Sequence, residues 1–490
     1  MSKFISFVCV LLILNTIKSE DKLVFVMTHF RHGARAPTGL YEKYNDYVKE
    51  RWTNPGELTG SGQRMHYLLG LRNRIRYVEN FKFLSEKFDP HEILIYSSPF
   101  NRTINSVASQ LQGLYPQSAK KGEVLTDAQE KLAVPQIDIS AQEIQEEIKN
   151  LNKNALPNSM MLAPIRMINL NEKKIILYDI DPCTKKRDEI KKKNSETLDT
   201  LKNIVKTFQT DYRQYLDKLY QKTENYDIGF LDRFCDSFIA SYTDGRELSA
   251  VTAAGFDKDK TRDFCYEFQK LNFRDWISGD KEHVLAHVEV SKLMREFIHY
   301  MRQRIDADIK GEKIDEKYED YSKPKMLIVS GHDSTVSCYE IFLMEVFGYP
   351  IDFYVLPKFA TQIAFEITTS SDQTTTKTYA DYKISFYFND DLKFTKTVNE
   401  FIEKVTPHIW SDEKVDQFCG FEEEKTDKKE DEEEGESSDF EFNKLCIIFF
   451  VFFLLFMGIS IFLIIKIIRT SSTKIPNEPL VSSTNSSGQS

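Results

Sequence analysis

The sequence predicts an α/β fold, because short buried strands alternate with amphipathic helices. Three apolar segments have the length and composition of buried strands, namely Leu23–His29, Ile93–Ser98 and Lys325–Ser330. Apolar residues recur at helical spacing over Val284–Ile305, which predicts a long helix with one buried face. Each predicted strand runs directly into a polar loop. Ligands of open α/β sheets bind at the carboxyl ends of strands, so these three loops form the candidate functional site.

The first of these loops, Arg31–Pro37, has the sequence RHGARAP. The guanidinium groups of Arg31 and Arg35 can hold a tetrahedral dianion in a bidentate manner. His32 lies between them, and a neutral imidazole nitrogen is a usable nucleophile toward phosphorus. Gly33 permits a close approach of the backbone to a ligand. The alternative interpretation of this loop alone is a basic surface turn after a core strand.

The other two loops also carry polar chemistry. Arg102 and Thr103 follow the second strand and lead into a predicted helix, and His332 and Asp333 follow the third strand. A histidine next to an aspartate is a weak signal by itself, because the pair can be an ordinary turn. Asn101 begins an N-glycosylation sequon, and we expect it to be enclosed if Arg102 lines a phosphate site.

RHGARAP resembles the RHGxRxP motif of the histidine acid phosphatases, a branch of the phosphoglycerate-mutase-like superfamily. The segment LTGSG is similar to the start of the helix behind that loop, and the second and third loops resemble the family's other two motifs. The motifs occur in the family's order, and the resemblance covers roughly Leu23 to Cys419. It implies an α/β fold with a central, mostly parallel sheet flanked by helices. We expect this core at residues 20–117 and 269–420, with a mainly helical cap inserted at residues 118–268.

The resemblance implies an acid phosphatase that hydrolyses phosphate monoesters through a phosphohistidine and needs no cofactor. His32 would be the nucleophile, and Asp333 would protonate the leaving alcohol. Four further residues would bind the phosphoryl group: Arg31, Arg35, Arg102 and His332. Neighbouring cations favour the neutral form of a histidine, so His32 should remain a nucleophile at acidic pH.

Two alternatives remain open. One is a phytase or inositol-polyphosphate phosphatase of the same fold, which a strongly basic pocket wall would favour. The other is a catalytically silent membrane receptor on this scaffold. His283 and His287 are four residues apart and could ligate a metal, but no third ligand is evident and the resemblance implies no metal.

The two ends of the chain predict that the protein is exported and anchored in a membrane. The chain has 490 residues, and residues 1–19 have the charge and apolar run of a signal peptide. Residues 445–465 are long and apolar enough to cross a bilayer, and basic residues follow them, which places the tail 466–490 in the cytosol. The topology is single-pass type I, in a lysosome, another endomembrane compartment or the cell surface. The resemblance also allows a homodimer.

The acidic segment 421–444 should be an unfolded stalk between the enzyme and the membrane. Twelve acidic residues and three lysines lie within residues 421–442, so this stretch carries −9 of the net charge of −10. The rest of the chain is close to neutral, which argues against a broad nucleic-acid-binding surface.

Five cysteines belong to the predicted exported body, and an exported compartment permits disulfides. The sequence contexts of Cys183 and Cys419 resemble the family's long-range bridge between the cap and the C-terminal segment. The resemblance therefore implies a disulfide between these two residues.

Cys235 lies in a segment that resembles the family's second bridge, but Gln362 stands where its partner is expected. Cys265 is the nearest remaining cysteine, so we expect it to pair with Cys235. This assignment leaves Cys338 as a buried free thiol and departs from the family pattern.

Overall fold

The computed structural model describes most of the chain between residues 21 and 420. The described residues are 21–38, 52–116, 124–135, 137, 139–167, 186, 189–190, 195–220, 226–278, 283–311, 324–349, 355–370 and 377–420. The chain divides into two compact units, Met1–Cys419 and Gly420–Ser490. The predicted signal peptide, stalk, membrane span and tail lie outside the described residues. Within the described ranges, no helix is both long and apolar enough to cross a bilayer.

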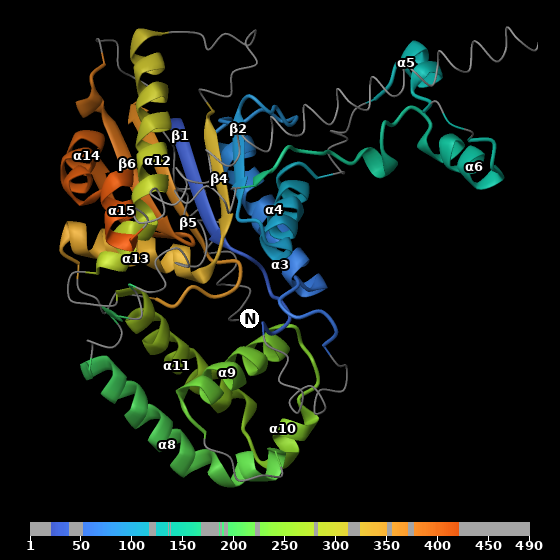
Figure 1. Ribbon diagram of the computed structural model, residues 1–490. Helices are drawn as coiled ribbons and strands as arrows, with labels where there is room; N and C mark the ends of the chain where they lie inside the picture. Colours follow the sequence, from blue (N-terminus) through green and yellow to red (C-terminus); the bar gives the residue numbers. More distant parts are fainter. Residues whose placement is uncertain are drawn as a thin grey trace, which may run out of the picture. The chain divides into compact units, whose positions relative to one another are not determined.

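The first unit is built around one sheet whose strand order is β3-β2-β4-β1-β5-β6-β7 (Figure 1). The strands are β1 Asp21–Arg31, β2 Ile93–Ser97, β3 Arg166–Met167, β4 Met326–Gly331, β5 Gln362–Ser370, β6 Tyr382–Phe388 and β7 Asp391–Thr397. The helices are α3 Gly60–Asn73, η1 Arg74–Asn80, α4 Asn101–Leu114, α5 Asp127–Leu132, α6 Gln142–Leu151, η3 Pro157–Ser159, α8 Ser195–Tyr220, α9 Ile228–Thr243, α10 Ser249–Ala254, α11 Lys258–Ser278, α12 Val284–Lys310, α13 Asp333–Phe347, η6 Tyr379–Asp381, α14 Val398–Val405, η7 Thr406–His408 and α15 Asp412–Cys419. The α/β class is therefore confirmed.

The sheet is mixed, so the expectation of a mostly parallel sheet needs correction. Strands β3, β2, β4 and β1 pair in parallel, whereas β1–β5, β5–β6 and β6–β7 are antiparallel. Phe388 of β6 pairs with Asp391 of β7, so Asn389 and Asp390 alone connect these strands. A two-residue connection can join only antiparallel neighbours, and Asn389 adopts the positive φ of 53° that tight turns require.

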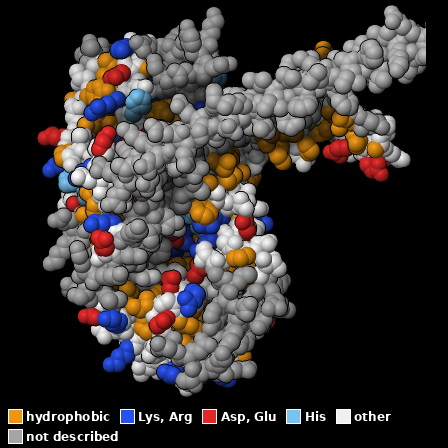
Figure 2. All heavy atoms as spheres, viewed as in Figure 1, with side chains coloured by type: hydrophobic (Ala, Val, Ile, Leu, Met, Phe, Trp, Pro, Cys, Tyr) orange, Lys and Arg blue, Asp and Glu red, His pale blue; other side chains and the backbone are white. Residues whose placement is uncertain are grey.

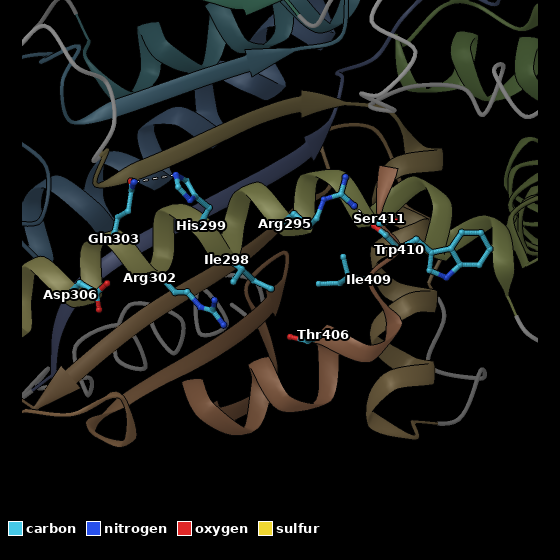
Figure 3. Close-up of a pocket in the computed structure, with 10 residues that line it drawn as sticks. All are labelled: Arg295, Ile298, His299, Arg302, Gln303, Asp306, Thr406, Ile409, Trp410 and Ser411. Carbon is cyan, nitrogen blue, oxygen red and sulfur yellow. Dashed lines mark hydrogen bonds between the residues drawn. The ribbon is translucent and has the colours of Figure 1, made fainter. Parts of the chain in front are cut away.

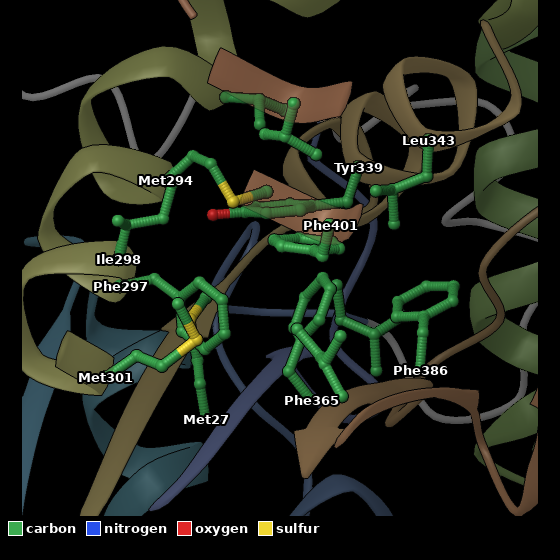
Figure 4. Packing of buried hydrophobic residues seen from close by; sticks show 14 of the residues in the cluster. Met27, Met294, Phe297, Ile298, Met301, Tyr339, Leu343, Phe365, Phe386 and Phe401 are labelled. Carbon is green, nitrogen blue, oxygen red and sulfur yellow. The ribbon is translucent and has the colours of Figure 1, made fainter. Parts of the chain in front are cut away.

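Helices cover both faces of the sheet and form two apolar cores. Successive side chains of a strand point to opposite faces. In β4, Leu327 and Val329 pack in the core formed with α12, α13 and α14, whereas Met326 and Ile328 pack in the core formed with η1 and α4. Figure 4 shows the first core, where the ring of Phe297 of α12 packs against Phe365 of β5 and Phe401 of α14. A strand buried on both faces reads as a continuous apolar run, which explains why β4 was evident in the sequence.

Helices α8 to α11 share a separate, aromatic-rich core. The structure contains the disulfide between Cys235 of α9 and Cys265 of α11, whose Cα atoms are 5.1 Å apart. Cys338 is a buried free cysteine. Cys419 is disulfide-bonded, but Cys183 lies outside the described residues, so their pairing stays a prediction. Helix α11 continues to Ser278, past the predicted cap boundary at residue 268.

The segment that carries α5 and α6 exposes apolar side chains. Neither helix contains a buried residue. Figure 2 shows hydrophobic side chains gathered on this segment, and the exposed set includes Leu132, Ile137, Ile144, Ile148 and Leu162. A contiguous exposed apolar surface is typical of a site that contacts another molecule.

Two glycines allow α3 and α4 to touch through their backbones. A Cβ atom at Gly113 would collide with the carbonyl oxygen of Tyr67, and a Cβ atom at Gly70 would collide with that of Gln110. We expect Gly113→Ala to lower the free energy of unfolding by about 1–3 kcal/mol, because the two helices must separate. Urea-induced unfolding followed by circular dichroism measures the change.

Gly60→Ala is the matched control for this prediction. Gly60 lies in the same pair of helices, and a Cβ atom there would meet no atom within 4 Å. Its free energy of unfolding should match or exceed that of the original chain. Equal losses in both variants would contradict the packing argument.

Candidate active site

The three predicted loops meet because the parallel strands before them are in register. Arg31 at the end of β1 is paired with Gly331 of β4, and Ser97 of β2 is paired with Ser330 of β4. The three carboxyl ends therefore lie side by side at one edge of the sheet. Helices α4 and α13 begin within a few residues of these ends, so Arg102 and Asp333 lie in the first turns of their helices.

His32 is buried with one ring nitrogen held by the backbone. Its Nδ1 is 2.9 Å from the carbonyl oxygen of Gly33. A carbonyl oxygen can only accept, so Nδ1 carries the proton in this hydrogen bond and the neutral ring keeps its lone pair on Nε2. Burial, together with Arg31 and His332, lowers the pKa of His32 well below the usual 6.5. The side chain is therefore poised as a neutral nucleophile.

His332 lies against His32, with 5.5 Å between the ring centroids. Its Nε2 is 2.9 Å from Oγ of Ser98, and the ring of Phe100 lies edge-on to it. Burial, followed by the charges of Arg102 and Arg31, lowers the pKa of His332 well below 6.5. Ser98 was not among the predicted site residues.

Arg31 and Asp333 form an ion pair across two of the loops. Nη2 of Arg31 is 2.7 Å from Oδ2 of Asp333. Nη1 of Arg31 donates to the carbonyl oxygen of Pro357 at 2.7 Å, and its guanidinium carbon lies 4.2 Å above the centre of the Phe359 ring. The backbone N–H of Ser334 donates to Oδ1 of Asp333. These contacts fix both side chains at the strand ends.

Arg35 is held by a carboxylate from α9. Nη2 of Arg35 is 2.9 Å from Oδ1 of Asp236, and Nη1 is 3.4 Å from Oδ2. Nη1 also donates to the carbonyl oxygen of Ala36. Within the described part of the chain, Nε of Arg35 and Nε of Arg31 are buried donors without an acceptor. Buried N–H donors of this kind are suited to bind an anion.

Arg102 joins the same group of charges. Its guanidinium carbon lies 4.3 Å from the centre of the Phe100 ring, and its charge contributes to the lowered pKa values of His32 and His332. The preceding residue, Asn101, is exposed and donates to Oε1 of Glu57. The expectation that Asn101 would be enclosed is wrong, because it points outward from the first turn of α4 while Arg102 is partly buried.

Two glycines set the position of the loop that carries His32. A Cβ atom at Gly33 would lie 2.7 Å from Cα of Gly62, which is too close for any side chain. The backbone N–H of Gly33 donates to Oγ of Ser106 in α4 at 3.1 Å. The loop is thus clamped between the starts of α3 and α4, which explains why the LTGSG segment accompanies the RHG motif.

The structure brings together all six predicted site residues, Arg31, His32, Arg35, Arg102, His332 and Asp333. It adds three that sequence reasoning missed: Ser98, Asp236 and Phe359. Ser98 directly follows a predicted strand, so its position was a usable signal. Asp236 and Phe359 come from distant segments, and no local pattern marks which of their residues face the site.

A second group of polar side chains lies elsewhere. The nearest donor atoms of His287, Glu345 and His408 lie within 4.8 Å of one another. His283 is not part of this group. His287 is bonded through Nε2 to Glu345 and through Nδ1 to the carbonyl oxygen of His408, so hydrogen bonds account for both ring nitrogens. The absence of a metal stays a prediction.

A cavity of about 560 Å³ also lies outside the site. It is lined by α12 and the segment after α14, and none of the six site residues borders it (Figure 3). Figure 3 shows Arg295, Arg302 and Trp410 among its lining residues. This cavity is therefore separate from the charged groups that converge at the strand ends.

Comparisons with known proteins find similarity to acid phosphatases in sequence. The chain is 38% identical over 103 residues to testicular acid phosphatase from Homo sapiens, which covers 20% of this chain and 24% of that protein. It is 26% identical over 162 residues to lysosomal acid phosphatase from Rattus norvegicus, which covers 33% of this chain and 30% of that protein. The chain thus spans less than a third of the length of these curated relatives. A Hafnia alvei phytase structure matches with a TM-score of 0.47 and 13% identity, over 82% of this chain and 99% of that one.

The family comparison covers more of the chain than any of these sequence alignments. Residues 22–389 match the histidine phosphatase superfamily (branch 2), and this range contains all three loops of the site. The resemblance drawn from the sequence motifs is confirmed. The chain belongs to the histidine phosphatase superfamily (branch 2).

Proposed function

We propose that this protein is an acid phosphatase that hydrolyses phosphate monoesters through a phosphohistidine at His32. One observation carries the proposal: the bond from Nδ1 of His32 to the Gly33 carbonyl leaves the lone pair on Nε2 to attack, beside three arginines whose charges lower the pKa of the ring. The acid phosphatases among its relatives support the same activity.

The reaction proceeds in two balanced steps. Nε2 of His32 attacks phosphorus, the bond to the ester oxygen breaks, and Asp333 gives its proton to the departing alcohol. Water then attacks the phosphohistidine, Asp333 takes a proton from that water, and phosphate leaves with the His32 lone pair restored. Asp333 is paired with Arg31, so an arriving phosphate competes with it for the guanidinium.

Positive charge replaces a metal in this scheme. Phosphoryl transfer depends mainly on positioning and on neutralising the phosphoryl oxygens. Arg31, Arg35 and Arg102 supply that charge, and the buried Nε donors of the first two await acceptors. His332 is the fourth proposed contact, and its Nε2 is bonded to Oγ of Ser98.

Metal independence follows as an expected result. Dialysis against EDTA should leave kcat and KM for p-nitrophenyl phosphate unchanged, because arginines supply the positive charge of the site. Vanadate should inhibit competitively, since it can bind His32 in a five-coordinate form that resembles the transition state of phosphoryl transfer. Loss of activity in EDTA that a divalent ion restores would contradict this charge assignment.

The acid limb of the pH profile should lie below pH 6.5. A histidine with its usual pKa would protonate and lose its nucleophilicity as the pH falls through 6.5, but burial and Arg31 lower the pKa of His32. Activity should therefore persist below pH 6.5 and fall only as the pH passes through the lowered value. The pH dependence of kcat/KM reports this pKa in the free enzyme. A loss centred near 6.5 would show an unperturbed nucleophile.

The natural substrate can be narrowed by one comparison. Rates on p-nitrophenyl phosphate and on phytate, measured with the same preparation, separate a general monoesterase from a phytase. We expect the first to be much faster. Inactivity on both compounds at every pH from acidic to neutral would favour the silent receptor.

We also propose that the enzyme is exported and anchored by one membrane span, in a lysosome or at the cell surface. The apolar segments at residues 1–19 and 445–465 and the lysosomal name of one relative support this proposal. Alkaline carbonate extraction should leave the full chain in the membrane pellet and release a chain that ends at Gly420. A homodimer is a further proposal, supported by the exposed apolar side chains of α5 and α6, and light scattering of the purified protein tests it.

A further inference from the structure

We propose that Asp236 of α9 is a positioning residue for the reaction, which holds the Arg35 guanidinium in the orientation that contacts the phosphoryl group. This inference rests on the proposed phosphatase function. It assigns to the helical segment α8–α11 a direct part in the chemistry, because the carboxylate that aims a phosphate-binding arginine comes from that segment and not from the sheet.

The geometry is that of a carboxylate with its acceptor positions filled. Both oxygens of Asp236 face the guanidinium of Arg35, which is the bidentate arrangement that fixes an arginine in orientation as well as position. Oδ2 also accepts from the backbone N–H of Thr38 at 2.9 Å and from its hydroxyl at 3.1 Å. Asp236 therefore holds two points of the loop, Arg35 and Thr38, at once.

Charge and burial support the same role. The side chains of Arg35 and Asp236 are only 10% and 20% exposed. Burial alone would raise the pKa of Asp236, but the charge and hydrogen bonds of Arg35 outweigh it and lower the pKa. The lowered pKa keeps Asp236 ionised, and so paired with Arg35, to a lower pH than an ordinary aspartate.

Helix α9 is itself firmly placed. The residue before Asp236 is Cys235, whose disulfide ties α9 to α11. One turn later, Ala240 packs with Trp52 and with Ala36 of the catalytic loop, and Nε1 of Trp52 donates to Oγ of Ser241. A fixed helix gives Asp236 a fixed position, which a positioning residue needs.

Two nitrogens of Arg35 are occupied by Asp236 and the Ala36 carbonyl, while its Nε is buried without an acceptor in the described residues. These bonds use three of the five guanidinium N–H donors, and the buried Nε donor stays available to a phosphoryl oxygen. Loss of the carboxylate would free the guanidinium to rotate. It would also remove a negative charge near the phosphate site, so the affinity for phosphate should fall less than kcat does.

Asp236→Asn tests this inference, with Asp232→Asn as the matched control. Asp232 lies one turn earlier on α9 and acts on Arg35 through its charge, and Asn272 donates to it. With p-nitrophenyl phosphate, Asp236→Asn should lower kcat by roughly tenfold or more and change KM by less than about threefold, because a misoriented group slows the chemical step. Asp232→Asn should stay within about twofold of the original enzyme.

A double-mutant cycle with Arg35→Lys separates positioning from a structural role. If Asp236 acts through Arg35, the double variant should be no slower than Arg35→Lys alone, because lysine lacks the guanidinium group that Asp236 orients. Additive losses, or a loss confined to KM, would overturn the inference. If Asp236→Asn does not fold, Asp236→Glu keeps the charge and should show an intermediate kcat; a kcat equal to that of the original enzyme would also overturn it.

Different experimental results would overturn the proposed function and this inference. An original enzyme without phosphatase activity overturns both. An active enzyme that loses activity in His32→Ala but keeps it in Asp236→Asn overturns the positioning role alone.

Discussion

His32→Ala is expected to lower kcat for p-nitrophenyl phosphate by at least about four orders of magnitude. His32 is the proposed nucleophile, because the bond from Nδ1 to the Gly33 carbonyl orients the ring and leaves the lone pair on Nε2. Alanine has no such lone pair. The arginines would still bind phosphate in this variant, so inorganic phosphate should still be bound. Steady-state kinetics and phosphate binding, measured on the same preparation, check both expectations.

His91→Ala is the control for this variant, because His91 is exposed and is bonded to Asp89, away from the three loops of the site. Circular dichroism should show the same fold for all three proteins. Near-normal activity in His32→Ala would refute the nucleophile and with it the phosphohistidine route.

Asp333→Asn should slow the reaction in a way that depends on the leaving group. Asparagine keeps the shape of the side chain and can still accept from Arg31, but it has no acidic proton to give. For an alkyl phosphate, whose alkoxide leaves poorly, kcat should fall by about 10²–10⁴-fold. For p-nitrophenyl phosphate, whose phenolate leaves without help, the loss should be much smaller.

A series of aryl and alkyl phosphates that differ in leaving-group pKa measures this dependence. The slope of log kcat against leaving-group pKa should be steeper in Asp333→Asn than in the original enzyme. Parallel slopes would assign Asp333 a role in binding and leave the identity of the acid open.

Local signals explain what could be predicted from the sequence. The loops at Arg31, Arg102 and His332 each follow a strand that is apolar on both faces, so their positions at strand ends were evident. The three loops are close together because the strands that precede them pair in parallel. The register of Arg31 with Gly331 brings the ends of β1 and β4, and so the loops that follow them, side by side.

Long-range contacts explain what could not be predicted. Asp236 reaches Arg35 across 201 positions of sequence, and any of several acidic residues on the cap could have done so. The antiparallel half of the sheet was missed because the decisive signal is only the two-residue turn Asn389-Asp390. Gln362 occupies the position where a family cysteine was expected and bonds instead to Asn73 and Gln110 in a buried amide network.

The most direct test of the account is to trap the enzyme during turnover. The full chain is mixed with p-nitrophenyl phosphate, quenched within milliseconds into base, in which a phosphohistidine survives, and digested for mass spectrometry. The account predicts a phosphoryl group on His32 in the original enzyme and no labelled peptide in His32→Ala. An original enzyme that turns over with no covalent phosphate, or that carries it on another residue, would contradict the central claim.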